Sequence, residues 1–309
     1  MDIPTIQPPK LRAGDTISIV APASTVEQRD GFERGVAALE RMGFRVRFNE
    51  RIFQSSRYLA GDDSARAEEL MNAFEDPSVQ AIMALRGGYG CSRLIPHLME
   101  KRLRHHPKVF VGFSDMTTLH MYLRRRFGWV TIHGPMAASP CLANMPAGQE
   151  QHFLSLCTDP EYRPSLSFEG MEMWSPGSAE GILAGGCLSI IAAGIGTPYE
   201  IKTEGKILFL EDQGEPPYRL DRMLTQLLLS GKLQSVAGVL LGSFVDCEPD
   251  RGNYTAADTM KDILRSLHVP VISGFPAGHG IDNWAIPLGA RVLMDADACS
   301  IHFLESAVQ

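Results

Sequence analysis

The sequence lacks the features that mark several large classes of protein. It holds no apolar run of roughly 18 residues, which a membrane-spanning helix needs, and no apolar segment behind its first charges of the kind found in a secretory signal peptide. The net charge is −7, so composition provides no electrostatic attraction for nucleic acid. We therefore expect a cytoplasmic protein that binds neither a membrane nor nucleic acid.

Cysteines are few, and the usual metal-ligand and phosphate-binding motifs are missing. No two cysteines form a CxxC pair, and neither HExxH nor HxH occurs. No GK[ST] of a P-loop and no GxGxxG of a dinucleotide-binding fold is present. We predict reduced thiols, no metal site and no bound cofactor. The six cysteines are Cys91, Cys141, Cys157, Cys187, Cys247 and Cys299.

Apolar and amphipathic segments alternate through the first half of the chain. Short apolar runs of the buried-strand type are separated by segments with helical spacing, which predicts an α/β fold with a doubly wound parallel sheet. The expected strands are 16–22, 44–48, 79–85, 109–113 and 130–133, and the expected helices are 27–42, 62–74 and two that begin near 92 and 116.

Residues 158–180 break this pattern with several prolines and glycines, and we predict a linker there. The sequence then predicts an N-terminal domain over 1–157 and a smaller C-terminal α/β domain over 181–309. In the second domain the expected strands are 206–210, 236–241 and 269–275, the expected helices are 217–229 and 256–267, and 291–294 and 300–303 form an expected hairpin.

The residues that could carry out chemistry lie in the loops between the predicted strands and helices. Functional loops of a doubly wound sheet gather at the carboxyl ends of its strands, so 21–24, 86–90 and 112–115 are expected to converge. In the third loop Ser114 follows an apolar run and precedes helical spacing. A hydroxyl on such a turn suits a nucleophile beside an oxyanion donor. Alternatively, Ser114 or Asp115 merely caps the following helix.

Three further positions carry candidate groups at predicted strand ends. Gly87 and Gly88 either bring backbone N–H groups close to a phosphate or an oxyanion, or form a plain flexible turn. Glu211 either orients a histidine or caps the helix that starts near residue 217. His279 stands between two glycines and is a general-base candidate, for which His133 competes.

Four motifs in this order resemble the LD-carboxypeptidases, also called muramoyltetrapeptide carboxypeptidases, of the serine peptidase class. The resemblance spans the chain from residue 14 to residue 289. Each motif alone is weakly specific, and their order makes the resemblance strong. The motifs are RGGYG at 86–90, GFSD at 112–115, LED at 210–212 with PYRLDR at 217–222, and GHG at 278–280.

The resemblance implies a catalytic triad and a fold. Ser114 would be the nucleophile, His279 the general base and Glu211 the group that orients the imidazole, with backbone N–H groups of Gly88 and Asp115 as oxyanion donors. It implies a flavodoxin-like N-terminal domain, a site at the domain interface and a homodimer. The implied substrate is a muropeptide tetrapeptide, which loses its terminal D-alanine in peptidoglycan recycling.

Two features of this chain refine that expectation. Cys187 stands where the family usually has asparagine, which puts local hydrogen bonding in doubt but not the triad. An exopeptidase must recognise a terminal carboxylate, and Arg86 beside Gly87 and Tyr89 is our candidate for substrate binding. The alternative for Arg86 is a salt bridge that supports the loop.

Two other functions remain open at the level of sequence. Microcin-C-immunity-type peptidases share the scaffold and cleave aminoacyl-nucleotide conjugates. They need an aromatic platform for the base, for which Trp174 and Trp284 are candidates in predicted loops. A non-catalytic binder of small peptides is the second alternative, although it would have no reason to keep serine, glutamate and histidine at three strand ends.

Overall fold

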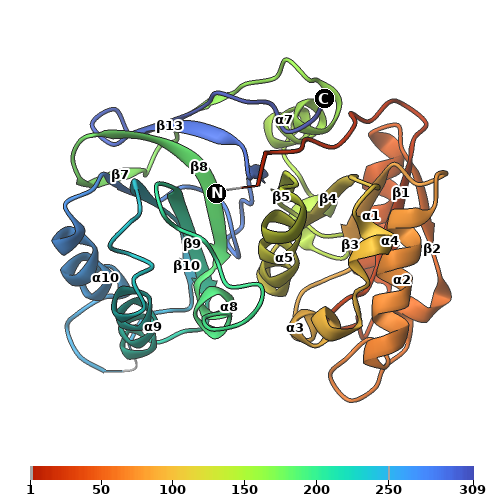
Figure 1. Cartoon of the computed structure of the whole chain (residues 1–309), viewed down its shortest axis with the longest axis horizontal. Helices are drawn as coiled ribbons and strands as arrows, with labels where there is room; N and C mark the ends of the chain where they lie inside the picture. Colours follow the sequence, from red (N-terminus) through yellow and green to blue (C-terminus); the bar gives the residue numbers. More distant parts are fainter. Residues whose placement is uncertain (1–2, 250) are drawn as a thin grey trace. The chain divides into compact units, whose positions relative to one another are not determined.

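The computed structural model of the chain describes residues 3–249 and 251–309, which form two compact units (Figure 1). The first unit runs to Tyr162 and also contains Trp284–Pro287 and Ser306–Gln309. The second unit comprises Arg163–Asn283 and Leu288–Glu305.

The first unit is built on a six-stranded sheet in the order β12-β5-β4-β3-β1-β2. The neighbouring pairs among β1 to β5 are all parallel. The order 2-1-3-4-5 is the flavodoxin-like one, so the predicted fold class is confirmed. The strands are β1 (Thr16–Val20), β2 (Arg45–Phe48), β3 (Ala81–Ala84), β4 (Val109–Gly112), β5 (Thr131–His133) and β12 (Ile286–Leu288).

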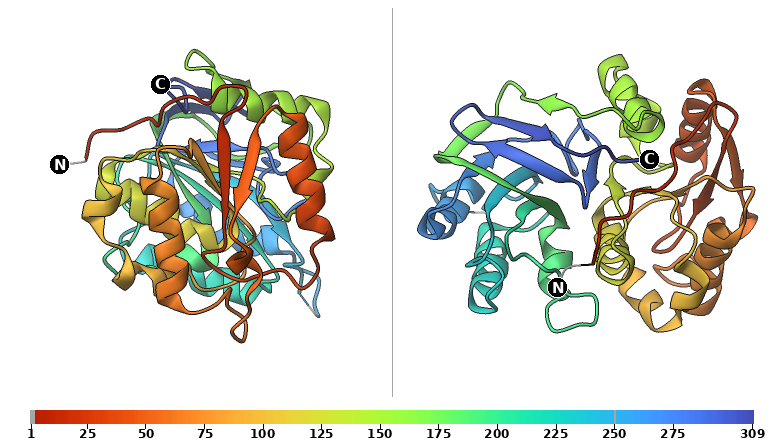
Figure 2. Two further views of the ribbon diagram at one scale, coloured as in Figure 1. Left: turned by 90° about the vertical axis from the view of Figure 1, so that its right-hand side faces the viewer. Right: turned by 45° about the horizontal axis from the view of Figure 1, so that its top comes forward.

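Helices cover both faces of this sheet, which explains why β3 and β4 are buried along their whole length. The left view of Figure 2 shows α1 and α2 on opposite sides of β1 and β2. The helices are α1 (Asp30–Arg41), α2 (Asp63–Glu75), α3 (Cys91–Leu94), α4 (Glu100–Leu103), α5 (Thr117–Phe127), α6 (Pro140–Ala143) and α7 (Ala147–Thr158), with 3-10 turns η1 (Glu50–Phe53), η2 (Ile95–His97) and η3 (Ser114–Met116).

Local chemistry explains where these helices begin, end and pack. Phe32 and Leu39 of α1 share one buried cluster with Phe153 of α7. Asp62 caps α2 by accepting a hydrogen bond from the Ala65 N–H at 2.8 Å, as its position in the sequence predicts. The apolar stripes of α1 and α7 therefore form the core on one face of the first sheet.

The second unit holds an eight-stranded mixed sheet in the order β6-β14-β13-β8-β9-β10-β11-β7. Its centre, from β8 to β11, is parallel, and the flanking pairs are antiparallel. Helix α9 lies between α8 and α10 (Figure 1). The elements are β6 (Ser165–Leu166), β7 (Glu172–Ser175), β8 (Ser178–Cys187), α8 (Leu188–Ala193), β9 (Ile207–Gln213), α9 (Pro217–Leu229), β10 (Gly238–Val245), α10 (Ala256–Leu264), η4 (Arg265–Leu267), β11 (Val271–Ser273), β13 (Arg291–Asp295) and β14 (Ser300–Phe303).

The predicted division of the chain differs from the observed one. Residues 158–180 are not a linker, because they contain β6, β7 and the start of β8. The glycines that suggested a linker, Gly170 and Gly177, take positive φ angles of 89° and 107° outside these strands. The boundary falls after Tyr162, and β12 returns to the first sheet beside β5.

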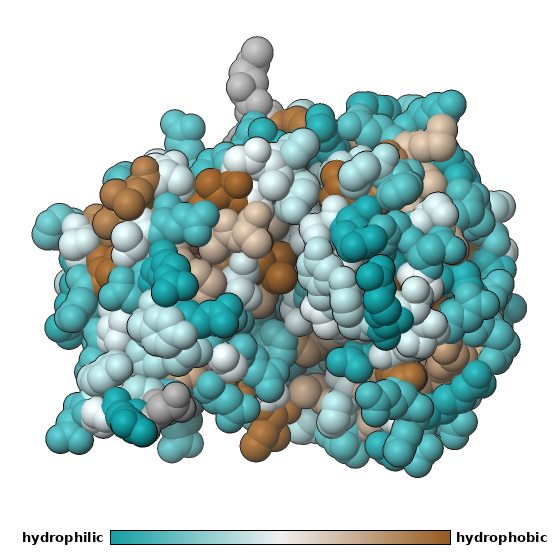
Figure 3. All heavy atoms as spheres, turned by 90° about the horizontal axis from the view of Figure 1, so that it is seen from below, coloured by the Kyte–Doolittle hydropathy of each residue, from teal (hydrophilic) through white to brown (hydrophobic). Residues whose placement is uncertain are grey.

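The described residues contain no helix with both the length and the apolar character needed to cross a membrane. On the face shown in Figure 3, hydrophobic side chains form small separate groups among hydrophilic ones.

Candidate active site

The three loops that were expected to converge do contact one another within the first unit. The N–H of Ser24 donates to the carbonyl of Gly87 at 3.3 Å. The N–H of Cys91 donates to the Asp115 carboxylate at 2.8 Å. A Cβ atom added to Gly87 would lie 2.8 Å from Oγ of Ser114. The glycine-rich loop therefore packs directly against the candidate nucleophile, and only glycine fits there.

Ser114 has the backbone of a nucleophile elbow. It follows the buried strand β4, begins the turn η3 and has a φ of +62°, which is uncommon for a residue other than glycine. Such backbone strain concentrates at functional sites, and this strand–turn–helix arrangement projects the hydroxyl from the sheet. No side chain caps η3 or α5, so the interpretation of Ser114 or Asp115 as a cap of that helix is wrong.

His120 supports the strand that leads to Ser114. Its ring nitrogens lie 2.9 Å from the carbonyl of Gly112 and 2.8 Å from Oγ1 of Thr131. Burial lowers the pKa of His120 to about 3. The imidazole is therefore neutral, and its Nε2–H donates to the Gly112 carbonyl because a carbonyl only accepts.

Arg86 and Tyr89 of the glycine-rich loop are both exposed. Nη1 of Arg86 donates to the carbonyl of Thr25 at 3.3 Å. No salt bridge involves Arg86 within residues 3–249 and 251–309, so the alternative of a loop-supporting salt bridge is wrong. The Tyr89 ring lies 5.8 Å from the ring of Tyr58, which is also exposed.

The second unit joins Glu211 to His279. Oε2 of Glu211 lies 2.7 Å from Nδ1 of His279, the Glu211 side chain is fully buried, and 15% of the His279 side chain is exposed. A Cβ atom at Gly278, whose φ is +118°, would overlap Oε2 of Glu211. Glu211 lies inside β9 rather than after its end, as its position had suggested, and it contacts a histidine instead of capping α9.

The electrostatics of this pair suit a general base. Burial of His279 acts to lower its pKa, but the hydrogen bond and charge of Glu211 and the charge of Asp212 outweigh it and raise the pKa. A carboxylate only accepts, so Nδ1 carries the proton toward Glu211. The neutral ring then keeps its basic lone pair on Nε2.

Cys187 donates a hydrogen bond to the carboxylate next to this pair. Its Sγ lies 3.4 Å from Oδ1 of Asp212, and the Ser189 N–H donates to Oδ2 of Asp212 at 2.7 Å. Burial raises the pKa of the Cys187 thiol well above its usual value, and the charges of Glu211 and Asp212 raise it further. Cys187 is therefore a neutral donor and not a thiolate.

The structure separates the two histidines that competed for the role of base. His133 is fully buried at the end of β5, where its ring centre lies 5.8 Å from that of Phe113 in an edge-to-face arrangement. His279, and not His133, lies beside Glu211. Across the described part of the chain, no group of three or more His, Cys, Asp or Glu side chains is arranged to hold a metal ion.

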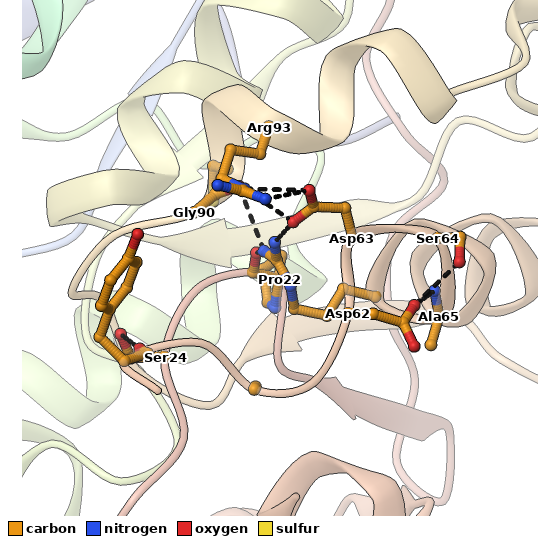
Figure 4. Close-up of polar contacts among 12 residues, drawn as sticks. Pro22, Ser24, Asp62, Asp63, Ser64, Ala65, Gly90 and Arg93 are labelled. Atoms are coloured by element: carbon orange, nitrogen blue, oxygen red, sulfur yellow. Dashed lines mark hydrogen bonds and ion pairs between the residues drawn. The ribbon is translucent and has the colours of Figure 1, made fainter. Parts of the chain in front are cut away.

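The sequence did not point to Arg66, which is fully buried below the glycine-rich loop. Its guanidinium donates to the carbonyls of Pro22 and Gly90 and to the carboxylate of Asp63. Nε and Nη2 of Arg93 donate to Oδ1 and Oδ2 of Asp63 at 2.9 and 2.6 Å. Figure 4 shows the two side chains facing each other. The available signal was Asp63 and Arg66 three residues apart at the start of a predicted helix.

Both halves of the chain match the models of a known protein family. The family model of the LD-carboxypeptidase N-terminal domain matches residues 17–134, and that of the LD-carboxypeptidase C-terminal domain matches residues 180–294. The murein tetrapeptide carboxypeptidase of Pseudomonas aeruginosa is 34% identical over 91% of this chain and 93% of its own.

Two solved structures extend the comparison. The muramoyltetrapeptide carboxypeptidase from Oxalobacter formigenes superposes with a TM-score of 0.81 at 32% identity, covering 93% of this chain and 97% of its own. MccF in complex with glutamyl sulfamoyl guanosine superposes with a TM-score of 0.92 over 98% of this chain and 99% of its own, and at 22% identity it shows the shared fold.

Proposed function

The chain belongs to the LD-carboxypeptidase family, and from this premise we propose that it is a serine carboxypeptidase that releases terminal D-alanine from muropeptide tetrapeptides. The observation that carries the proposal is the 2.7 Å pair of His279 with the buried Glu211, together with the strained turn at Ser114. The reaction breaks the amide between the L-type centre of a diamino acid and D-alanine. It would serve peptidoglycan recycling in the cytoplasm.

In the proposed mechanism Ser114 attacks the carbonyl carbon while Nε2 of His279 takes the hydroxyl proton. The imidazolium that forms is stabilised by Glu211 through Nδ1. His279 then protonates the leaving amine, and D-alanine departs. Water repeats the sequence on the acyl-enzyme and frees the peptide.

The tetrahedral oxyanion is proposed to accept hydrogen bonds from the backbone N–H groups of Gly88 and Asp115. Gly88 lies in the glycine-rich loop with a φ of +107°, and Asp115 belongs to the first turn after β4. The N–H groups of a first turn have no acceptor within the helix, which supports Asp115 as a donor. Each such donor is worth about 10²–10³ in rate.

Arg86 is proposed to bind the terminal carboxylate of the substrate, with Gly87 and Tyr89 beside it. Its exposed guanidinium makes one long hydrogen bond to a carbonyl and no salt bridge among the described residues, so it has donors left for a bidentate carboxylate.

The nearest rival, cleavage of an aminoacyl-nucleotide, has weaker support. Trp174 lies in strand β7 rather than in a loop and is 8% exposed. Nζ of Lys261 lies 4.7 Å from the centre of the Trp174 ring. Trp284 is half-buried and packs against His152 at 5.0 Å. Neither predicted platform therefore presents a wholly open ring for a base to stack on.

Mass spectrometry of a muropeptide tetrapeptide incubated with the wild type and with Ser114→Ala tests the proposal. We expect loss of one alanine with the wild type only, and an unchanged melting temperature for the variant. Cleavage of an aminoacyl-nucleotide analogue instead would move the assignment to the rival substrate. Cleavage of the tetrapeptide by both proteins would exclude Ser114 as the nucleophile.

Two further measurements separate the remaining alternatives. A serine-directed phosphonate should label the wild type and not Ser114→Ala, whereas a non-catalytic peptide binder would be labelled in neither. We also propose a homodimer, and light scattering during size-exclusion chromatography would show a monomer if that is wrong.

A further inference from the structure

One peptide unit in the glycine-rich loop is held at both ends by the buried side chains of Arg66 and Asp115. The carbonyl of Gly90 accepts a hydrogen bond from Nη1 of Arg66 at 3.1 Å. The N–H of the same peptide, on Cys91, donates to Oδ2 of Asp115 at 2.8 Å. Arg66 is 0% exposed and Asp115 is 1% exposed, so solvent does not compete for either contact.

We propose that Arg66 and Asp115 are positioning residues that clamp the Gly90–Cys91 peptide and thereby fix the spacing of the two oxyanion donors, the N–H groups of Gly88 and Asp115. This inference rests on the proposed serine hydrolase function. It assigns a role to two side chains that the proposed mechanism does not use.

The connectivity of the clamp supports this role. Asp115 supplies one proposed oxyanion donor from its own backbone, and its carboxylate holds the loop that supplies the other. Gly88 lies two residues before the clamped carbonyl of Gly90. Arg66 also donates to the carbonyl of Pro22, so the loops after β1, β3 and β4 are all tied by these two side chains.

The other contacts of the loop are weaker. The Ser24 N–H reaches the Gly87 carbonyl at 3.3 Å, and the Tyr89 N–H reaches Oγ of Ser24 at 3.4 Å. Both exceed the usual length of an N–H···O hydrogen bond. The clamp is shorter and lies in the interior, so we expect it to determine the position of the loop.

The arrangement also has an energetic cost. Nε of Arg66 is buried and has no hydrogen-bond partner among the described residues. An unsatisfied buried donor destabilises the folded state, and such groups call for an explanation. Holding the loop for catalysis is an explanation that the geometry provides.

The test compares two carboxylates that cap a backbone N–H at the same distance. Asp115 accepts from the Cys91 N–H at 2.8 Å, and Asp62 accepts from the Ala65 N–H at 2.8 Å, with no hydrogen bond between its carboxylate and the glycine-rich loop among the described residues. Steady-state kinetics on the muropeptide tetrapeptide and melting temperatures are measured for Asp115→Ala, Asp115→Asn and Asp62→Ala.

We expect Asp115→Ala to lower kcat by about 10²-fold with little change in KM, because oxyanion donors act on the transition state. Asp115→Asn keeps an acceptor oxygen for the Cys91 N–H and should restore most of kcat. Asp62→Ala should lower the melting temperature and leave kcat unchanged.

Wild-type kcat in folded Asp115→Ala would overturn the inference, and so would equal losses of kcat in Asp115→Ala and Asp62→Ala. If Asp115→Ala does not fold, Arg66→Lys tests the inference instead, because lysine keeps the positive charge but can donate to fewer carbonyl groups. We expect kcat of Arg66→Lys to be about tenfold lower, and a wild-type kcat would refute the clamp. Turnover by Ser114→Ala, or none by the wild type, would instead refute the proposed function.

Discussion

Glutamine in place of Glu211 tests the electrostatic role of the pair that Glu211 forms with His279. The change keeps the size of the side chain and removes a charge 2.7 Å from Nδ1 of His279. Burial acts to lower the pKa of His279, while Glu211 and Asp212 raise it. Without the Glu211 charge we therefore expect the pKa of His279 to fall.

Two effects set the size of the loss in kcat. The imidazolium loses a hydrogen bond to a charged group, worth about 1.5–3 kcal/mol, or about 10- to 160-fold in rate. Solvent does little to screen this pair, because the side chains of Glu211 and His279 are 0% and 15% exposed. A glutamine amide can also turn its NH₂ toward Nδ1 and favour the wrong tautomer, which costs about 10⁴ in the serine protease triad. We expect kcat to fall by about 10²–10⁴.

The assay is D-alanine release measured as a function of pH. In the proposed mechanism His279 must be neutral, so activity should decline as pH falls through the pKa of that group. A lower pKa in Glu211→Gln moves this decline to more acidic pH, while the plateau drops. Asp212→Asn is the matched control. It removes the next carboxylate of β9, which accepts a hydrogen bond from the Ser189 N–H and also raises the pKa of His279. The pH at which activity declines should therefore also become more acidic, while kcat falls far less than in Glu211→Gln.

A Glu211→Gln enzyme whose activity declines at the same pH as the wild type, with the same kcat, would refute this reasoning. Equal effects of the two substitutions would show that the nearby negative charge matters and the direct hydrogen bond does not.

Three further predictions concern neighbouring residues. Arg86→Lys should raise KM strongly with kcat nearly kept, because a lysine cannot pair with a carboxylate through two parallel hydrogen bonds; unchanged KM in steady-state kinetics would exclude Arg86 from carboxylate binding. Gly278→Ala should lower stability by about 1–3 kcal/mol and reduce kcat, because its Cβ overlaps Oε2 of Glu211 at a φ of +118°; a denaturant titration that matches the wild type would contradict this. The pKa of His279 is raised in the folded state, from an ordinary value of 6.5. The pairing of His279 with Glu211 therefore stabilises the folded protein fully at a pH below 6.5, and this stabilisation is lost as pH rises through the raised pKa. The melting-temperature advantage of the wild type over His279→Gln should therefore shrink as pH rises through that interval, and a constant difference would refute it.

The parallel sheet and the meeting of loops at the first site were predictable from sequence. Apolar runs such as 109–113 have no polar alternation, which indicates strands buried on both faces. Once a doubly wound sheet is inferred, the carboxyl ends of β1, β3 and β4 must lie on one edge. That geometry brings Ser24, Gly87 and Ser114 together without any further information.

Other features were not predictable, because they depend on contacts distant in sequence. The glycines and prolines of 158–180 have the same local signature in a linker and in turns between short antiparallel strands. Charged residues at 211–212 suggested the end of a strand, but β9 continues to Gln213 because it pairs with β10 as far as Val245. The burial of Arg66 and its contacts could not be predicted, since an arginine on a helix is usually solvated.

The return of residues 284–287 to the first sheet constrains how this chain can be made and dissected. Strand β12 completes the edge beside β5, and Ala285 accepts a hydrogen bond from His152 at 2.8 Å. During translation the β5 edge of the first sheet therefore remains unpaired until most of the second unit has been synthesised. A fragment that ends at Tyr162 would keep that edge exposed, so proteolysis or truncation there should yield a piece prone to pair with other chains rather than an independent domain.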